Sequence, residues 1–135
     1  MQNGKRTHQR TVVVADDNPK ALALVLRILE LRYKVMAQGA DGEALVEAVT
    51  RLQPDAAIVD IAMPILNGIE AVERFRPTSR TAVVYLTAQN EPVLIRKALA
   101  AGGLGYVLKA AAAEDLIPAI EAALIGKTFL SPSLE

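Results

Sequence analysis

Acidic side chains stand at the ends of short apolar segments in this sequence. Asp16 and Asp17 follow the apolar run that begins at Thr11, and Asp60 ends the run that begins at Ala56. Three carboxylates brought together repel one another, and a hard divalent cation with oxygen ligands relieves that repulsion. Magnesium usually takes one or two carboxylates and keeps water or phosphate oxygens as its other ligands. The pattern predicts a magnesium site with room for a phosphoryl group.

A hydroxyl and an amine follow the same pattern. Thr87 ends a further apolar run, and Lys109 follows another. Phosphoryl transfer needs mainly positioning and charge neutralisation, and a carboxylate can itself be the nucleophile, forming an aspartyl phosphate. Taken singly, each residue also fits a structural role, because Asp and Thr are common in turns and Lys is usually a solvated charge. Their joint placement at strand ends favours a functional site.

The elements that must position these side chains alternate between apolar strands and amphipathic helices. The apolar runs lack the polar alternation of half-exposed strands, which indicates strands buried on both faces. Strands are predicted at residues 11–15, 33–37, 56–60, 81–87 and 105–108, and helices at 19–31, 41–52, 69–75, 91–101 and 115–124. Right-handed crossovers convert this order into an α/β fold, a doubly wound five-stranded parallel sheet with five helices. In such a sheet, ligands bind at the carboxyl ends of the strands.

The composition sets limits on the class of protein. A chain of 135 residues with 52% hydrophobic content fits one domain. Its formal net charge of zero argues against direct binding to nucleic acid or to a membrane surface. The absence of cysteine excludes disulfides and thiolate metal sites and fits a cytoplasmic location. Residues 1–10 lack the apolar core of a signal peptide and are predicted to form a disordered tail.

Two nucleotide-binding motifs are excluded by their spacing. Residues 126–128 would end a P-loop, but Glu121 stands where its first glycine belongs, and the segment follows a helix instead of a strand. The glycines at 102, 103 and 105 do not form a dinucleotide fingerprint, because Leu108 stands in the place of the third glycine. A helix stop and a turn explain these glycines better.

The motifs in their order resemble the CheY-like receiver domain of two-component response regulators. They are VVADD at 13–17, IVDIAMP at 58–64, NG at 67–68, LTA at 86–88 and GYVLK at 105–109. The resemblance extends from residue 11 to about residue 124 and implies the flavodoxin-like fold. It implies that Asp60 accepts a phosphoryl group from a sensor histidine kinase. The domain would then be a signalling switch with slow self-dephosphorylation and not an enzyme acting on external substrates.

The resemblance also implies a role for each residue of the metal site. Asp17 and Asp60 would bind Mg²⁺ directly, together with the backbone carbonyl of Ala62. Asp16 would act mainly through water. This set remains an implication of the resemblance, since the spacing alone does not assign the ligands.

Three further residues would sense the phosphoryl group. Lys109 would contact it, Thr87 would move to bond it, and Tyr106 would be the aromatic switch that follows. In physical terms, phosphorylation adds charge and acceptor oxygens at the sheet edge and biases a nearby surface between two packings.

The sequence departs from the usual pattern at two positions. Lys109 is followed by Ala110, where many receivers have proline, so a cis bond at this position is not assumed. Pro118 falls within the last predicted helix, where proline fits only in the first turn or at a kink. If the helix begins with Asp115 as its cap, Pro118 lies in the first turn and does little harm. Otherwise the helix is kinked at Pro118, which argues against a dimer surface there.

The end of the sequence points to a subfamily. Residues 126–132, GKTFLSP, resemble the segment that joins the receiver to a helix-turn-helix domain in LuxR-type (NarL-like) regulators. Residues 11–125 are thus predicted to be the receiver and 126–135 the start of a linker. The resemblance implies that DNA is bound only through a C-terminal domain missing here, and that phosphorylation favours a homodimer. We favour truncation of a longer transcription factor over a natural single-domain regulator.

Two other functions compete with the switch as explanations of the pattern. A phosphohydrolase of the haloacid-dehalogenase type needs a second acid two residues after the nucleophile, and Ala62 stands there. A phosphate-independent pseudo-receiver would be expected to have lost part of the acidic cluster, which is complete here. The switch is therefore the preferred hypothesis, and the pseudo-receiver is the alternative.

Overall fold

One parallel sheet forms the centre of the molecule. The computed structural model describes residues 9–88 and 90–132. Its six strands have the order β2-β1-β3-β4-β5-β6, and every neighbouring pair is parallel. The strands are β1 (Thr11–Ala15), β2 (Lys34–Gly39), β3 (Ala56–Val59), β4 (Ala82–Thr87), β5 (Gly105–Leu108) and β6 (Phe129–Leu130). The order reverses between β1 and β3, which in sheets of this kind marks the ligand crevice.

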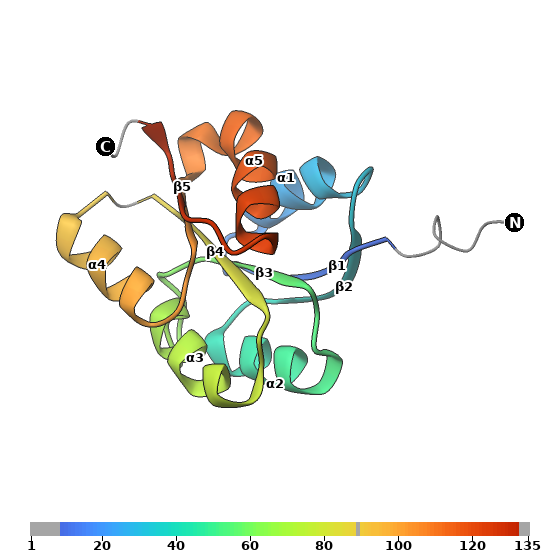
Figure 1. The fold of residues 1–135 in the computed structure, drawn as a ribbon. Coiled ribbons are helices and arrows are strands. Elements are labelled where there is room, and N and C mark those ends of the chain that lie inside the picture. Colours follow the sequence, from blue (N-terminus) through green and yellow to red (C-terminus); the bar gives the residue numbers. More distant parts are fainter. Residues whose placement is uncertain (1–8, 89, 133–135) are drawn as a thin grey trace, which may run out of the picture.

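Helices cover both faces of the sheet (Figure 1). They are α1 (Pro19–Leu29), α2 (Gly42–Leu52), α3 (Gly68–Phe75), α4 (Pro92–Ala100) and α5 (Ala112–Leu124). Two short 3₁₀ helices, η2 (Arg76–Thr78) and η3 (Lys109–Ala111), follow α3 and β5. Buried side chains of α1 and α5 pack on one face of the sheet, and those of α2, α3 and α4 pack on the other. Among the described residues, no helix has the length and apolar character needed to cross a membrane.

The sequence accounts for the positions of these elements. All four residues of β3 are buried, as expected for a strand covered on both faces. Side chains that accept hydrogen bonds from free N–H groups begin the first three helices: Asn18 for α1, Asp41 for α2 and Asn67 for α3. The predicted doubly wound parallel sheet with five helices is confirmed.

The predicted number of strands was wrong, because the sheet has a sixth strand beyond α5. Phe129 and Leu130 form β6, which pairs with Gly105 and Tyr106 of β5. The backbone N–H of Ser131 continues this pairing with a 3.0 Å hydrogen bond to the carbonyl of Tyr106. A strand of two residues shows no alternation in the sequence, and its formation depends on the free edge of β5.

The last helix begins earlier than predicted. Its first residue is Ala112, and Asp115 lies in its first turn instead of capping it. Ala112 and Leu116 are both buried, and the strong helix propensity of alanine extends the helix toward β5. Pro118 therefore lies inside α5. It has no N–H for the carbonyl of Glu114 one turn earlier.

No peptide bond among the described residues is cis.

Candidate functional site

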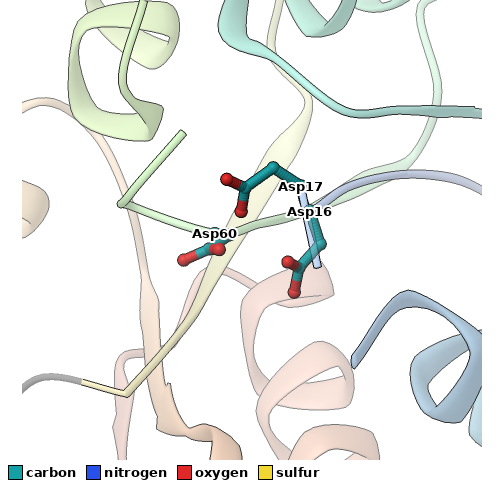
Figure 2. Close-up of side chains that lie close together, drawn as sticks. All are labelled: Asp16, Asp17 and Asp60. Carbon is teal, nitrogen blue, oxygen red and sulfur yellow. The ribbon is translucent and has the colours of Figure 1, made fainter. Parts of the chain in front are cut away.

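Three carboxylates meet at the carboxyl ends of neighbouring strands. Asp16 and Asp17 follow β1, Asp60 follows β3, and these strands are adjacent in the sheet. One oxygen from each carboxylate lies within 4.8 Å of the others, and Figure 2 shows the three side chains gathered at one place. Asp16 and Asp60 are buried, with 3% and 4% of their surface exposed, whereas Asp17 is exposed to solvent. The cluster is therefore buried at Asp16 and Asp60 and open to solvent at Asp17.

Lys109 completes the buried part of this cluster. Its Nζ lies 3.1 Å from Oδ2 of Asp60 and 3.0 Å from Oδ2 of Asp16. Burial alone would lower the pKa of Lys109, but its hydrogen bonds to Asp16 and Asp60 raise that pKa above the ordinary value. The lysine therefore stays charged and neutralises part of the acidic cluster.

The surroundings of Asp60 disfavour the charged form of its carboxyl group and so raise its pKa. Burial, together with the negative charge of Asp16, raises the pKa of Asp60 from 3.8 to about 6. The hydrogen bond from Lys109 and one from the backbone N–H of Ala62, at 3.2 Å to Oδ1, offset only part of this effect. The site therefore carries more negative charge than its own side chains neutralise, which favours an additional cation.

The carboxylate of Asp16 provides a test of whether a metal ion fits. Its Oδ1 accepts hydrogen bonds from the backbone N–H of Asn18 at 2.9 Å and from Nζ of Lys109 at 3.3 Å. Its buried Oδ2 accepts no hydrogen bond among the described residues, and the contact with Lys109 at 3.0 Å is an ion pair without hydrogen-bond geometry. Such an oxygen, beside two further carboxylates, suits a hard divalent cation such as Mg²⁺.

Thr87 and Tyr106 lie beside each other near this cluster. Thr87 ends β4, Tyr106 lies in β5, and both side chains are buried. Burial and the nearby carboxylate of Glu91 raise the pKa of Tyr106, whereas a side-chain hydrogen bond with Thr87 lowers it. The ring of Tyr106 also contacts that of Tyr85, with the ring centroids 6.4 Å apart. The side chain of Tyr106 is therefore buried in this structure, and in this position it contacts Thr87, the other predicted switch residue.

The backbone of Ala62 lies beside the carboxylate of Asp60. Ala62 belongs to the exposed turn after β3, and its N–H already contacts the carboxylate of Asp60. All seven residues of the predicted site therefore belong to the strand ends, to β5 or to the turns that follow the strands. Their roles in binding and transfer remain predictions.

Two residues near the site were missed by the sequence reasoning. Asn18 caps α1 with its side chain, and its N–H holds the carboxylate of Asp16. An asparagine directly before a proline is a typical start of a helix, and this signal could have identified it. Ser131 accepts a hydrogen bond from the N–H of Leu108, next to Lys109, and nothing local in the sequence indicated that contact.

Known proteins resemble this chain over most of its length. The family model for the response regulator receiver domain matches residues 12–121. The transcriptional regulatory protein DesR of Bacillus subtilis (strain 168) is 32% identical over 92% of this chain and 63% of its own length. The nitrate/nitrite response regulator protein NarL of Escherichia coli (strain K12) is 30% identical over 92% of this chain and 59% of its own. The chain thus spans about three fifths of these relatives.

Solved structures of response regulators are also similar to this chain. A LuxR-family two-component response regulator from Aurantimonas sp. SI85-9A1 superposes with a TM-score of 0.88 at 29% identity, over 93% of this chain and 92% of that one. The signal receiver domain of the putative response regulator NarL from Mycobacterium tuberculosis superposes with a TM-score of 0.84 at 30% identity, over 88% and 98%. The chain therefore belongs to the response regulator receiver domain family, and its relatives include regulators of the LuxR and NarL type.

Proposed function

We propose that this domain is a phosphorylation-dependent switch in which Asp60 accepts a phosphoryl group from a sensor histidine kinase. The observation that carries the proposal is the contact of Lys109 with Asp60 at 3.1 Å beside the carboxylates of Asp16 and Asp17. This arrangement provides a nucleophile, a fixed positive charge and a place for a divalent cation in one cluster. These are the parts that phosphoryl transfer requires.

In the proposed transfer, a carboxylate oxygen of Asp60 forms a bond to phosphorus as the phosphorus–nitrogen bond of a phosphohistidine breaks. The freed imidazole takes up a proton from solvent. Asp17, Asp60 and the carbonyl of Ala62 would hold Mg²⁺, with Asp16 acting mainly through water, and the bound ion would neutralise charge on the phosphoryl oxygens. Lys109, already charged and placed against Asp60, donates a hydrogen bond to one of those oxygens.

The phosphoryl group then changes the surroundings of Thr87 and Tyr106. A new acceptor near the end of β4 competes with the hydrogen bond that Thr87 now shares with Tyr106. Loss of that hydrogen bond removes one interaction that holds the side chain of Tyr106 in its buried position. The surface formed by α4 and β5 thereby favours a second packing.

The relatives suggest what this surface controls. DesR and NarL are regulators of transcription by name, and RcsB, another structural neighbour, has been solved in complex with DNA. We infer that phosphorylation favours a homodimer of a LuxR-type transcription factor, which binds DNA through a separate C-terminal domain. A cytoplasmic location follows from a kinase partner of this kind.

The proposal is tested by incubation with acetyl phosphate and Mg²⁺, followed by intact-protein mass spectrometry. Wild-type protein should gain one phosphoryl group, and Asp60→Asn should gain none. Asp41→Asn is a matched control, because it also removes one carboxylate while asparagine still caps α2. That control should be labelled like wild type. No adduct on wild-type protein with Mg²⁺ present would instead favour a phosphate-independent interaction module.

A further inference from the structure

The hydroxyl of Ser131 joins the two ends of the segment that carries Lys109. Its Oγ accepts a hydrogen bond from the backbone N–H of Leu108 at 3.1 Å and donates one to Oδ2 of Asp115 at 2.8 Å. Leu108 is the last residue of β5, and Asp115 lies in the first turn of α5. The corner between them contains η3, whose first residue is Lys109. One hydroxyl therefore fixes both where this corner begins and where it ends.

This corner has few other side-chain constraints. Within the described part of the chain, neither η3 nor α5 begins with a side-chain cap. The residues that follow Lys109, from Ala110 to Ala113, are alanines, which offer no polar group to the backbone. Besides the pairing of Leu108 with Thr87 and the burial of Ala112, the contacts of Ser131 therefore hold the backbone on either side of Lys109.

Ser131 is itself held firmly. Its side chain is fully buried, and its backbone N–H donates a 3.0 Å hydrogen bond to the carbonyl of Tyr106. Phe129 and Leu130 precede it as β6, paired with β5. Because the hydroxyl both donates and accepts, its removal would leave the N–H of Leu108 and the carboxylate of Asp115 without this partner.

We propose that Ser131 is a positioning residue for Lys109 in phosphoryl transfer, so that the strand β6 is a functional part of the receiver. The inference rests on the function proposed above. Nζ of Lys109 reaches Asp60 at 3.1 Å from the corner that Ser131 fixes, and displacement of that corner would lengthen this contact. The linkage is reciprocal: a change in the position of Lys109 on phosphorylation alters how strongly β6 is held.

The test compares the rate of labelling by acetyl phosphate at saturating Mg²⁺ in Ser131→Ala and Ser79→Ala. Ser79 is a matched control, since its buried hydroxyl bonds the side chain of Thr81 at 2.7 Å, before β4 at the opposite end of the sheet. We expect Ser131→Ala to slow labelling about tenfold through misplacement of Lys109, and Ser79→Ala to leave the rate near that of wild type. Binding of Mg²⁺ should not weaken in Ser131→Ala, because the serine acts through the lysine and not through the metal ligands.

Two further variants keep the test decisive. Asp115→Ala removes the acceptor and leaves the buried serine, so it carries the test if Ser131→Ala does not fold. Ser131→Thr keeps the hydroxyl and should recover most of the rate. Equal slowing in Ser131→Ala and Ser79→Ala, or wild-type rates in both Ser131→Ala and Asp115→Ala, would overturn the positioning role. Absence of labelling in wild-type protein would instead overturn the proposed function on which the inference rests.

Discussion

The side-chain nitrogen of Lys109 lies 3.1 Å from Oδ2 of Asp60, although β4 separates the strands that these residues follow. The lysine therefore reaches across the end of β4, whose last residue is Thr87. This single contact brings the third and fifth strand ends to one point. It also places a fixed positive charge against the carboxylate that we propose as the phosphoacceptor.

The raised pKa of Asp60 predicts how stability depends on pH without metal. The folded protein holds the proton of this carboxyl up to about pH 6, whereas the unfolded chain releases it near 3.8. The contribution of protonated Asp60 to the free energy of unfolding is therefore complete below pH 3.8. This contribution, about 1 to 3 kcal/mol, is lost as the pH rises through about 6. Urea unfolding in the presence of EDTA should show this loss in wild-type protein and not in Asp60→Asn. Parallel curves for the two proteins would contradict the assignment.

Removal of Lys109 should strengthen the binding of Mg²⁺. The ammonium group and the metal ion compete for the carboxylates of Asp16 and Asp60, so Lys109→Ala is expected to bind Mg²⁺ about fivefold more tightly. Isothermal titration calorimetry measures the affinity directly. Lys127→Ala, which removes an exposed lysine after α5, is the control and should bind like wild type. Weaker binding in Lys109→Ala would mean that the lysine organises the metal site.

Tyr106 and Tyr85 should respond differently to loss of their hydroxyls. Tyr106 shares a hydrogen bond with Thr87, whereas the buried hydroxyl of Tyr85 has no hydrogen-bond partner among the described residues. Tyr85→Phe is therefore expected to raise the free energy of unfolding by about 1 kcal/mol.

Phosphorylation should change the amide NMR chemical shifts of residues in α4. At equal extents of phosphorylation, these changes should be smaller in Tyr106→Phe than in wild type, and in Tyr85→Phe they should equal those of wild type. The same shifts should disappear in Lys109→Ala. Full-size shifts in Tyr106→Phe would remove this tyrosine from the switch.

Pro118→Ala should stabilise the domain. Pro118 is exposed inside α5 and leaves one backbone hydrogen bond unmade, and alanine restores it. Because alanine also gives the unfolded chain more freedom, the net gain in the free energy of unfolding should be about 1 to 2 kcal/mol. Chemical denaturation measures the change. A loss of stability would indicate that the proline ring itself contributes to the packing of α5.

Much of the site could be predicted because its chemistry is attached to strand ends. A run of buried residues such as Ala56–Val59 fixes a strand, and the topology of a parallel sheet then gathers whatever follows each strand. Asp16, Asp17, Asp60 and Lys109 were placed in this way without any knowledge of their contacts. The hydrogen bond of Thr87 with Tyr106 required side-chain positions that periodicity does not supply.

The features that were missed depend on tertiary contacts. Phe129 and Leu130 are too short to show a strand pattern, and they pair only because β5 would otherwise be an edge. Asp115 looked like a helix cap, but the buried positions of Ala112 and Leu116 extend α5 past it. In α5, burial against the sheet outweighed the local signal, whereas β6 formed without one.

The location of the phosphoryl group tests the central claim most directly. Protein labelled with acetyl phosphate and Mg²⁺ would be reduced with borohydride, which converts an aspartyl phosphate to homoserine, and then digested with trypsin. The peptide of residues 52–74 contains Asp55 and Asp60, and fragment ions distinguish the two. Homoserine at position 60 alone is the predicted result. Homoserine at position 16, 17 or 55, with Asp60 unmodified, would contradict the account.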